Sequence, residues 1–234
     1  MKPGSEDANA GEFDRVAERY DQELQRGLFL SGESKDFFAE HRVEWLRRCL
    51  GNERPESILD YGCGTGSTST LLLRRLRARS VFGVDTSEES LILARRAAAP
   101  GVRFGRIDEL QPNGAFDLAY CNGVFHHIPA DDRPEVVRTI FDAIKPGGWF
   151  AFWENNPWSL GARLVMRRIP FDRDAVLLSA RGARRTLQAY GFEVLTVHYL
   201  FVFPQMLGAL RRLEQALVRF PIGAQYQVLC RRPA

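Results

Sequence analysis

One acidic residue and three glycines lie within seven positions, in the run Asp60-Tyr61-Gly62-Cys63-Gly64-Thr65-Gly66. An apolar run precedes them and a leucine-rich helical pattern follows, which predicts a buried parallel strand, a tight turn and a helix. Glycine permits positive φ angles, and the three glycines remove the Cβ atoms that would face the turn. A ligand can therefore approach the main chain at the positive end of the helix, and the carboxylate of Asp60 favours a cationic ligand over a pyrophosphate.

A second carboxylate follows the next predicted strand. This strand spans residues 80–85 and ends in Asp85, which lies 19 positions beyond Gly66. Open α/β sheets bind ligands at the carboxyl ends of their strands, and an acid at this place accepts hydrogen bonds from ribose hydroxyls. Asp85 therefore predicts a nucleoside ligand without specifying which one. Thr86 or Ser87 is expected to cap the helix that follows.

Three residues are candidates for a general base. His126 and His127 follow the predicted strand at residues 116–121, and Glu154 ends the predicted strand at residues 149–154. All three are expected at the ligand-binding edge of the sheet. Histidine titrates near neutral pH, and a carboxylate can also accept a proton. The alternative for each is a structural role, and one of the two histidines is expected to point into packing or toward a cofactor.

The composition is that of a single globular domain. The chain has 234 residues, 45% of them hydrophobic, and its net charge of +3 is too small to indicate a nucleic-acid partner. The four cysteines form no CxxC pair, and no Asp, His and Glu cluster has metal-ligand spacing. We therefore expect a reduced, cytoplasmic protein without a metal site. No apolar run approaches the length of a membrane span, so membrane insertion is not expected.

The predicted strands and helices alternate, which is typical of an α/β sheet. Residues 1–11 are small and polar, and we expect a disordered tail there. Residues 12–50 are expected to form an N-terminal helical cap, with Ser34 at the start of its second helix. Residues 51–234 then form the sheet domain, with an excursion at about residues 155–178 that we expect to shape a substrate pocket.

The run from Asp60 to Gly66 resembles motif I of the class I S-adenosylmethionine-dependent methyltransferases, whose pattern is D/E-x-G-x-G-x-G. The segments at residues 122–128 and 145–154 resemble later parts of that family. The competing interpretation is a dinucleotide loop of the form GxGxxG, which fits less well because Ser67 replaces its third glycine. The resemblance implies a Rossmann-like sheet of seven mostly parallel strands, with helices on both faces and the last strand antiparallel.

The same resemblance implies roles for the site residues. Asp60 and the glycine loop would hold the methionine part of S-adenosylmethionine, with Asn122 lining the same end. Asp85 would bind the ribose and Asp108 would face the adenine. Tyr20, on the first predicted helix, would close over the cofactor or the acceptor. The complete set of cofactor-binding candidates is Asp60, Gly62, Gly64, Gly66, Asp85, Thr86, Asp108, Asn122 and Tyr20.

The resemblance thus implies an S-adenosylmethionine-dependent methyltransferase acting on a small molecule, with oxygen as the favoured acceptor atom. The alternatives are N- or C-methylation of a lipid- or quinone-like acceptor, action at a membrane surface, and a non-catalytic S-adenosylmethionine-binding protein of the same fold. Asp60 and Ser67 argue against an NAD-type oxidoreductase. The arginines between Arg163 and Arg185 suit either a solvated face or an anionic acceptor group. The oligomeric state stays open, a homodimer included.

Overall fold

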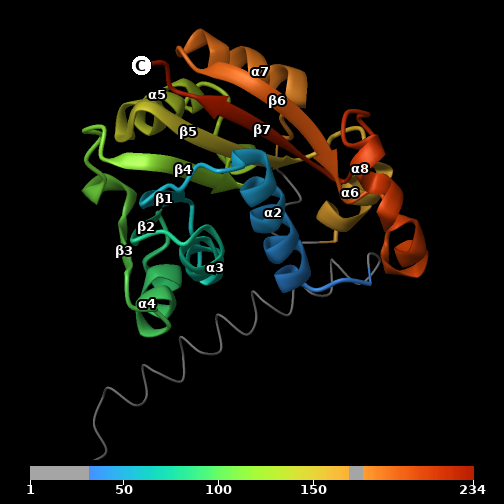
Figure 1. Cartoon of the computed structure of the whole chain (residues 1–234), viewed down its shortest axis with the longest axis horizontal. Coiled ribbons are helices and arrows are strands. Elements are labelled where there is room, and N and C mark those ends of the chain that lie inside the picture. The colour runs from blue at the N-terminus through green and yellow to red at the C-terminus, as the bar shows by residue number, and fades with distance from the viewer. Residues whose placement is uncertain (1–31, 169–175) are drawn as a thin grey trace, which may run out of the picture.

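The computed structural model describes residues 32–168 and 176–234, which are organised around one central sheet (Figure 1). The predicted tail at residues 1–11, the part of the predicted cap at residues 12–31, and Tyr20 lie outside the described residues. The strands are β1 (Ser57–Tyr61), β2 (Ser80–Asp85), β3 (Val102–Arg106), β4 (Phe116–Asn122), β5 (Ile144–Asn155), β6 (Glu193–Leu200) and β7 (Gln225–Arg231).

The strands lie in the order β3-β2-β1-β4-β5-β7-β6. β7 pairs antiparallel with β5 and β6, whereas β1 to β5 pair in parallel with one another. The predicted seven-stranded sheet with an antiparallel last strand is therefore confirmed. Because β1 to β5 run the same way, their carboxyl ends meet at one edge of the sheet. The predicted site residues that the structure describes lie at or just beyond the ends of β1, β2, β3, β4 and β5, at that edge.

Helices cover both faces of the sheet (Figure 1). Ser34 caps the first described helix as predicted, and Ser87 rather than Thr86 caps the helix after β2. The described α-helices are α2 (Lys35–Leu50), α3 (Ser67–Leu76), α4 (Glu88–Arg96), α5 (Arg133–Ala143), α6 (Leu160–Met166), α7 (Ala180–Ala189) and α8 (Glu214–Leu217). The 3₁₀ helices that matter below are Ile107–Glu109, Phe125–His127 and Gln205–Leu213.

Strand β1 shows how the sequence builds the two faces. Leu59 and Tyr61 are buried in a core with α5 and α7, whereas Ile58 is buried in a second core with α2 and α3. This alternation is that of a strand covered on both sides. Asp60 points to the α3 face, where it accepts a hydrogen bond from Ser69. The sheet thus places one carboxyl group inside an apolar layer, directly below the glycine turn.

Two strand boundaries differ from the prediction by more than one residue. β5 begins at Ile144 rather than at Trp149, because Ile144 pairs with Phe116 before the register shifts. The hydrophobic pattern also predicts a strand that runs on to Phe203, but β6 ends at Leu200. Phe201 has a φ of +63°, a left-handed conformation that no strand can continue through. The chain therefore turns at Phe201, and the segment between β6 and β7 leaves the sheet there.

Candidate active site

The turn between β1 and α3 carries the three glycines, with φ angles of 74° at Gly62, 53° at Gly64 and 79° at Gly66. A Cβ on Gly62 would lie 2.2 Å from Val124 Cγ2, and one on Gly66 would lie 2.4 Å from Phe104 Cζ. Close packing therefore requires glycine at these two positions. A Cβ on Gly64 would meet no heavy atom of the described residues within 4 Å. The main chain is open to a ligand at Gly64.

Asp85, at the end of β2, is held against this turn. Its Oδ2 accepts a hydrogen bond from Gly64 N at 2.8 Å, and its Oδ1 accepts one from Ser87 N at 2.9 Å. The residue is only half-buried, and each carboxylate oxygen can accept a further hydrogen bond. Asp85, the residue predicted to bind the ribose, thus lies next to Gly64, where the main chain is open. Thr86 follows and is exposed.

Asp60 lies beneath the turn and is 2% exposed. Its Oδ2 accepts a hydrogen bond from Ser69 Oγ at 2.6 Å. Burial raises the pKa of Asp60 to about 7, while the Ser69 hydrogen bond opposes the shift. The negative charge of Asp85 adds to the rise in pKa and the positive charge of Arg42 opposes it. A cationic ligand nearby would favour the ionised form of this carboxyl group.

Asn122 ends β4 on the same edge. Its Oδ1 is buried and has no hydrogen-bond donor among the described residues. A buried acceptor without a partner costs about 1–3 kcal/mol, and an ammonium group of a ligand would satisfy it. This orphaned oxygen and the open main chain at Gly64 fit a ligand with a cationic amino-acid part. These groups therefore fit the predicted S-adenosylmethionine.

Asp108 lies in the 3₁₀ helix Ile107–Glu109, directly after β3. Its side chain is 72% exposed, and its Oδ1 lies 3.3 Å from Nε of Arg106. It shares the edge of the sheet with Asp85, because β3 pairs in parallel with β2. An adenine contact at Asp108 stays a prediction.

His126 and Glu154 form a buried pair between the ends of β4 and β5. His126 Nδ1 lies 2.7 Å from Glu154 Oε2, and the two residues are 4% and 1% exposed. Glu154 Oε1 also accepts hydrogen bonds from the backbone N–H groups of Phe125 and His126, at 2.8 and 3.3 Å. Because a carboxylate only accepts hydrogen bonds, Nδ1 of His126 is the donor in this pair, and the bond fixes the orientation of the ring.

His127 is exposed, and its ring centroid lies 4.1 Å from that of His126. Both histidines line the same pocket. The structure thus joins two of the three predicted base candidates, His126 and Glu154, into one hydrogen-bonded unit and leaves His127 beside it. The residue that acts as the base stays a prediction.

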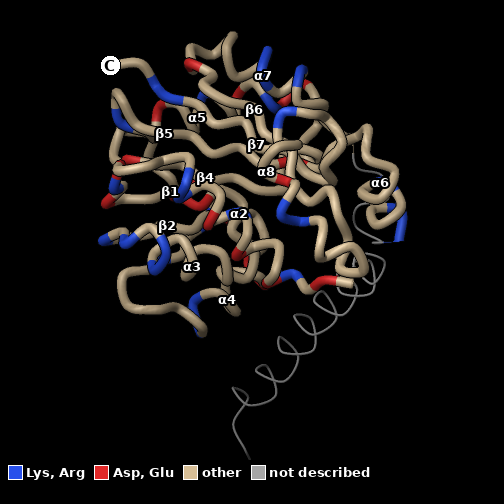
Figure 2. Tube along the Cα trace, turned by 45° about the vertical axis from the view of Figure 1, so that its right-hand side comes forward, with Lys and Arg blue, Asp and Glu red and all other residues tan. Residues whose placement is uncertain are grey.

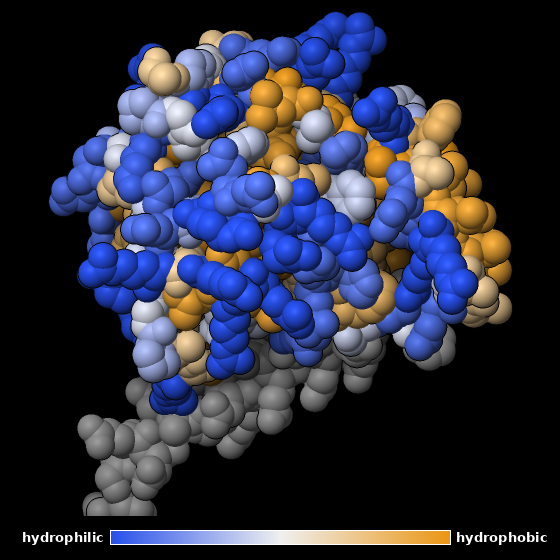
Figure 3. All heavy atoms as spheres, viewed as in Figure 1, coloured by the Kyte–Doolittle hydropathy of each residue, from blue (hydrophilic) through white to orange (hydrophobic). Residues whose placement is uncertain are grey.

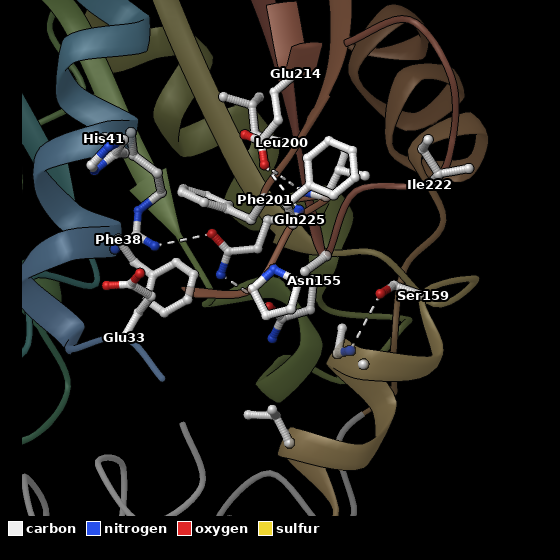
Figure 4. A pocket seen from close by; sticks show the side chains of 18 of the residues that line it. Glu33, Phe38, His41, Asn155, Ser159, Leu200, Phe201, Glu214, Ile222 and Gln225 are labelled. Atoms are coloured by element: carbon white, nitrogen blue, oxygen red, sulfur yellow. Dashed lines mark hydrogen bonds between the residues drawn. The ribbon is translucent and has the colours of Figure 1, made fainter. Parts of the chain in front are cut away.

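A pocket of about 1020 Å³ opens beside this unit (Figure 4). Residues of α2, of the loop after β4, of α6 and of the segment between β6 and β7 line it. Figure 4 shows Phe38, Leu200 and Phe201 at its apolar wall. Asn122 and His126 belong to the lining, whereas Asp60, Gly64 and Asp85 do not. The loop after β4 therefore lies where this pocket meets the predicted cofactor site.

The sequence-based prediction missed Arg42, which is 7% exposed and lines the pocket from α2. Its Nε donates to Tyr120 Oη at 3.2 Å, and its Nη1 donates to Gln225 Oε1 at 3.0 Å. Figure 4 shows the bond to Gln225 as a dashed line. One signal was available, since Arg42 stands on the buried stripe of α2, next to Val43. An arginine at an apolar position of a helix indicates a specific buried role.

All four cysteines are free thiols. Residues 32–168 and 176–234 contain no group of three or more His, Cys, Asp or Glu that could hold a metal ion. Over these same ranges, no helix has the length and apolar character needed to cross a membrane.

Comparisons with known proteins identify the family of the domain. Residues 35–197 match a family model described as a methyltransferase domain. A ubiquinone biosynthesis O-methyltransferase from Bordetella avium is 33% identical over 143 residues, which cover 55% of this chain and 58% of the relative. A trans-aconitate 2-methyltransferase from Deinococcus radiodurans is 34% identical over 100 residues, which cover 42% of this chain and 38% of the relative. The chain thus spans about half the length of these curated relatives.

A solved methyltransferase structure is also similar to this chain. The S-adenosylmethionine-dependent methyltransferase from Mesorhizobium loti superposes with a TM-score of 0.60 and is 26% identical in sequence. The superposition covers 81% of this chain and 98% of that one. The likeness therefore extends over most of this chain.

Proposed function

This chain belongs to the methyltransferase domain family, and from that membership we propose that it uses S-adenosylmethionine to methylate a hydroxyl oxygen of a small-molecule acceptor. The buried His126–Glu154 pair beside the pocket is the observation that favours a hydroxyl oxygen as the acceptor. A hydroxyl group must lose its proton as it attacks, and a histidine backed by a carboxylate is suited to take that proton. The relative named as an O-methyltransferase supports the same acceptor atom.

S-adenosylmethionine, when bound, supplies a methyl group on a positively charged sulfur, with a neutral thioether as the leaving group. In this proposal Asn122, Asp60 and the glycine turn hold its methionine part. Asp85 binds the ribose and Asp108 faces the adenine. The methyl group needs no further activation, so the remaining task of the protein is to orient the acceptor and to exclude water.

His126 takes the hydroxyl proton at Nε2 in the proposed reaction. Glu154 holds the imidazole in place and stabilises the imidazolium that forms, as the acidic member of a catalytic triad does. The backbone N–H groups of Phe125 and Asn155 donate to Glu154 at 2.8 and 3.3 Å. These bonds fix the carboxylate and thereby the ring that faces the acceptor.

A carboxylate is the second candidate acceptor, and Arg42 favours it. In the described residues the hydrogen-bond partners of this buried guanidinium, Tyr120 and Gln225, are both uncharged. An anionic acceptor in the pocket would pair with it, and several relatives, among them the one from Deinococcus radiodurans, are named trans-aconitate 2-methyltransferases. A carboxylate is already deprotonated, so this reaction would need no general base.

Labelled S-adenosylmethionine distinguishes the two acceptors. The protein is incubated with a set of catechols and with a set of tricarboxylates of similar size. We expect label in methyl ethers, at a rate that rises with pH until the base is deprotonated. Label only in methyl esters, with His126→Gln as active as the wild type, would assign the carboxylate instead. Tight cofactor binding without product from either set would contradict the proposal.

Replacing Asp85 by alanine should weaken S-adenosylmethionine binding by about 1–3 kcal/mol, because charge-assisted hydrogen bonds to the ribose are lost. Part of this loss comes from the turn, since Asp85 also accepts from Gly64 N. Calorimetric titration measures the affinity, and Asp108→Ala at the exposed acid serves as the comparison with a smaller expected effect. Wild-type affinity in Asp85→Ala would refute the ribose assignment.

The raised pKa of Asp60 should couple cofactor binding to proton release. Because its pKa in the folded protein is about 7 against an ordinary value of 3.8, Asp60 is largely neutral between these two values. A bound cation favours the ionised form, so binding below about pH 7 releases a proton and affinity rises with pH. Titrations in buffers of different ionisation enthalpy measure the protons released. Asp60→Asn should lack this release, and equal release in both proteins would exclude Asp60.

The same shift makes a stability prediction with a definite sign. The folded protein binds one more proton at Asp60 than the unfolded chain between pH 3.8 and about 7. The free energy of unfolding contributed by this group is therefore largest at low pH and falls as pH rises through that window. Denaturant unfolding of the wild type and of Asp60→Asn across pH isolates the contribution. A difference between the two proteins that does not vary with pH would show that Asp60 is not shifted.

A further inference from the structure

Two segments that are distant in the sequence carry large apolar side chains on the surface. We name as the apolar rim the residues Trp158, Leu160, Met206, Leu213, Phe220 and Ile222. Met206 is 93% exposed, Leu160 80% and Trp158 73%. Figure 3 shows hydrophobic residues gathered at the side of the molecule where Figure 1 places α6 and α8. None of the six belongs to either core of the described fold, so the packing of those cores does not account for them.

The apolar rim is continuous with the mouth of the pocket. Trp158, Leu160 and Ile222 line the pocket and are also exposed at the surface. Ile222 and Ser159 both line the pocket, and Figure 4 shows them at the right of the view. A molecule lying on the rim would therefore reach the His126–Glu154 pair through an apolar passage. This geometry suits an acceptor that arrives from an apolar phase.

Basic side chains surround the apolar rim. Residues 157–168 contain three arginines and no acid, and residues 204–222 contain three arginines and one glutamate. Glu214, the one acid, accepts hydrogen bonds from Val202 N and Phe203 N, and Arg211 pairs with Glu33. The other five arginines are exposed: Arg163, Arg167, Arg168, Arg212 and Arg219. Figure 2 shows basic residues at the α6 end of the molecule.

We propose that the apolar rim and its arginines dock this protein on an anionic phospholipid surface, from which the acceptor enters the pocket. Apolar side chains of an interfacial segment enter the boundary between headgroups and acyl chains, while arginines lie at the level of the anionic headgroups. Both features occur here on two segments that flank one opening. The docking itself does not depend on methyl transfer, whereas the entry of an acceptor rests on the proposed function.

Vesicle sedimentation tests the docking with the full chain. We expect binding to vesicles that contain one quarter phosphatidylglycerol in phosphatidylcholine, and weak binding to phosphatidylcholine alone. Binding should weaken as salt is added, because the attraction between arginine and anionic lipid is screened. Replacing Arg167 and Arg168 by glutamate should lower the affinity by at least about 25-fold, at about fivefold for each arginine removed.

The chain offers matched controls. Arg184 and Arg185 form a second exposed arginine pair, on α7, so Arg184→Glu/Arg185→Glu changes the charge equally at a helix outside the rim. Met206→Ser should weaken vesicle binding, whereas Leu195→Ser, at an exposed leucine of β6, should not. Met206 and the two arginine pairs do not line the pocket. Circular dichroism and the affinity for S-adenosylmethionine verify that each variant folds.

Three outcomes would overturn the docking proposal. In the first, the wild type does not sediment with anionic vesicles. In the second, the control variants at Arg184, Arg185 and Leu195 lose as much binding as the variants at Arg167, Arg168 and Met206. The third is a dimer in solution that Met206→Ser dissociates, without vesicle binding, which would assign the rim to a second copy of this chain. Failure of methyl transfer with intact vesicle binding would refute the proposed function and leave the docking standing.

Discussion

Replacing His126 by glutamine should lower kcat for a hydroxyl acceptor by about 10²–10⁴-fold, the usual contribution of a general base. The affinity for S-adenosylmethionine should change little, because the imidazole is paired with Glu154 at 2.7 Å rather than with the glycine turn. Glu154→Gln should lower kcat as well, since a neutral amide stabilises the imidazolium less than a carboxylate does. Single-turnover rates at saturating cofactor measure both effects.

His127→Gln is the matched control for this prediction. His127 is a neighbour of the same residue type, lines the same pocket and is exposed. It should retain most of the activity. If His127→Gln loses activity and His126→Gln does not, the base is His127 and the buried pair is structural. A rate profile that loses its dependence on pH in His126→Gln would separate a base from a residue that only packs.

The geometry of the glycine turn could be predicted from the sequence because its determinants are local. Asp60 and the glycines stand within one strand and one turn, and each positive φ angle follows from glycine at that position. The position of Asp85 at the carboxyl edge of the sheet could also be predicted, because the residue ends the second strand. In the structure a hydrogen bond from Gly64 N to Asp85 joins the two segments.

The acceptor side depends on contacts that are distant in the sequence. The sequence could not distinguish His126 from His127, because the difference is the carboxylate of Glu154, brought beside His126 by the pairing of β4 with β5. Arg42 meets Gln225, which lies 183 positions away. The turn at Phe201 is also set by its surroundings, since phenylalanine is not a residue that favours a left-handed conformation.

A large effect on cofactor affinity should also come from Gly64→Ala, because the added methyl group occupies the open space at the turn. The backbone cost of placing alanine at a positive φ is about 1–2 kcal/mol. A methyl group forced against a bound ligand costs about 1–3 kcal/mol more, which is about five- to 150-fold in Kd. Calorimetric titration and thermal unfolding, measured on the same protein, separate these two contributions.

Gly147→Ala is the control, because Gly147 also has a positive φ angle but lies away from the proposed cofactor site. Its φ is +75°, and an added Cβ would meet no heavy atom of the described chain within 4 Å. It lies near the start of β5, whereas the proposed cofactor site is at the carboxyl ends of the parallel strands. Both variants should lose similar stability, and only Gly64→Ala should lose affinity for S-adenosylmethionine. Equal affinities in the two variants would mean that the space beside Gly64 is not where the cofactor binds.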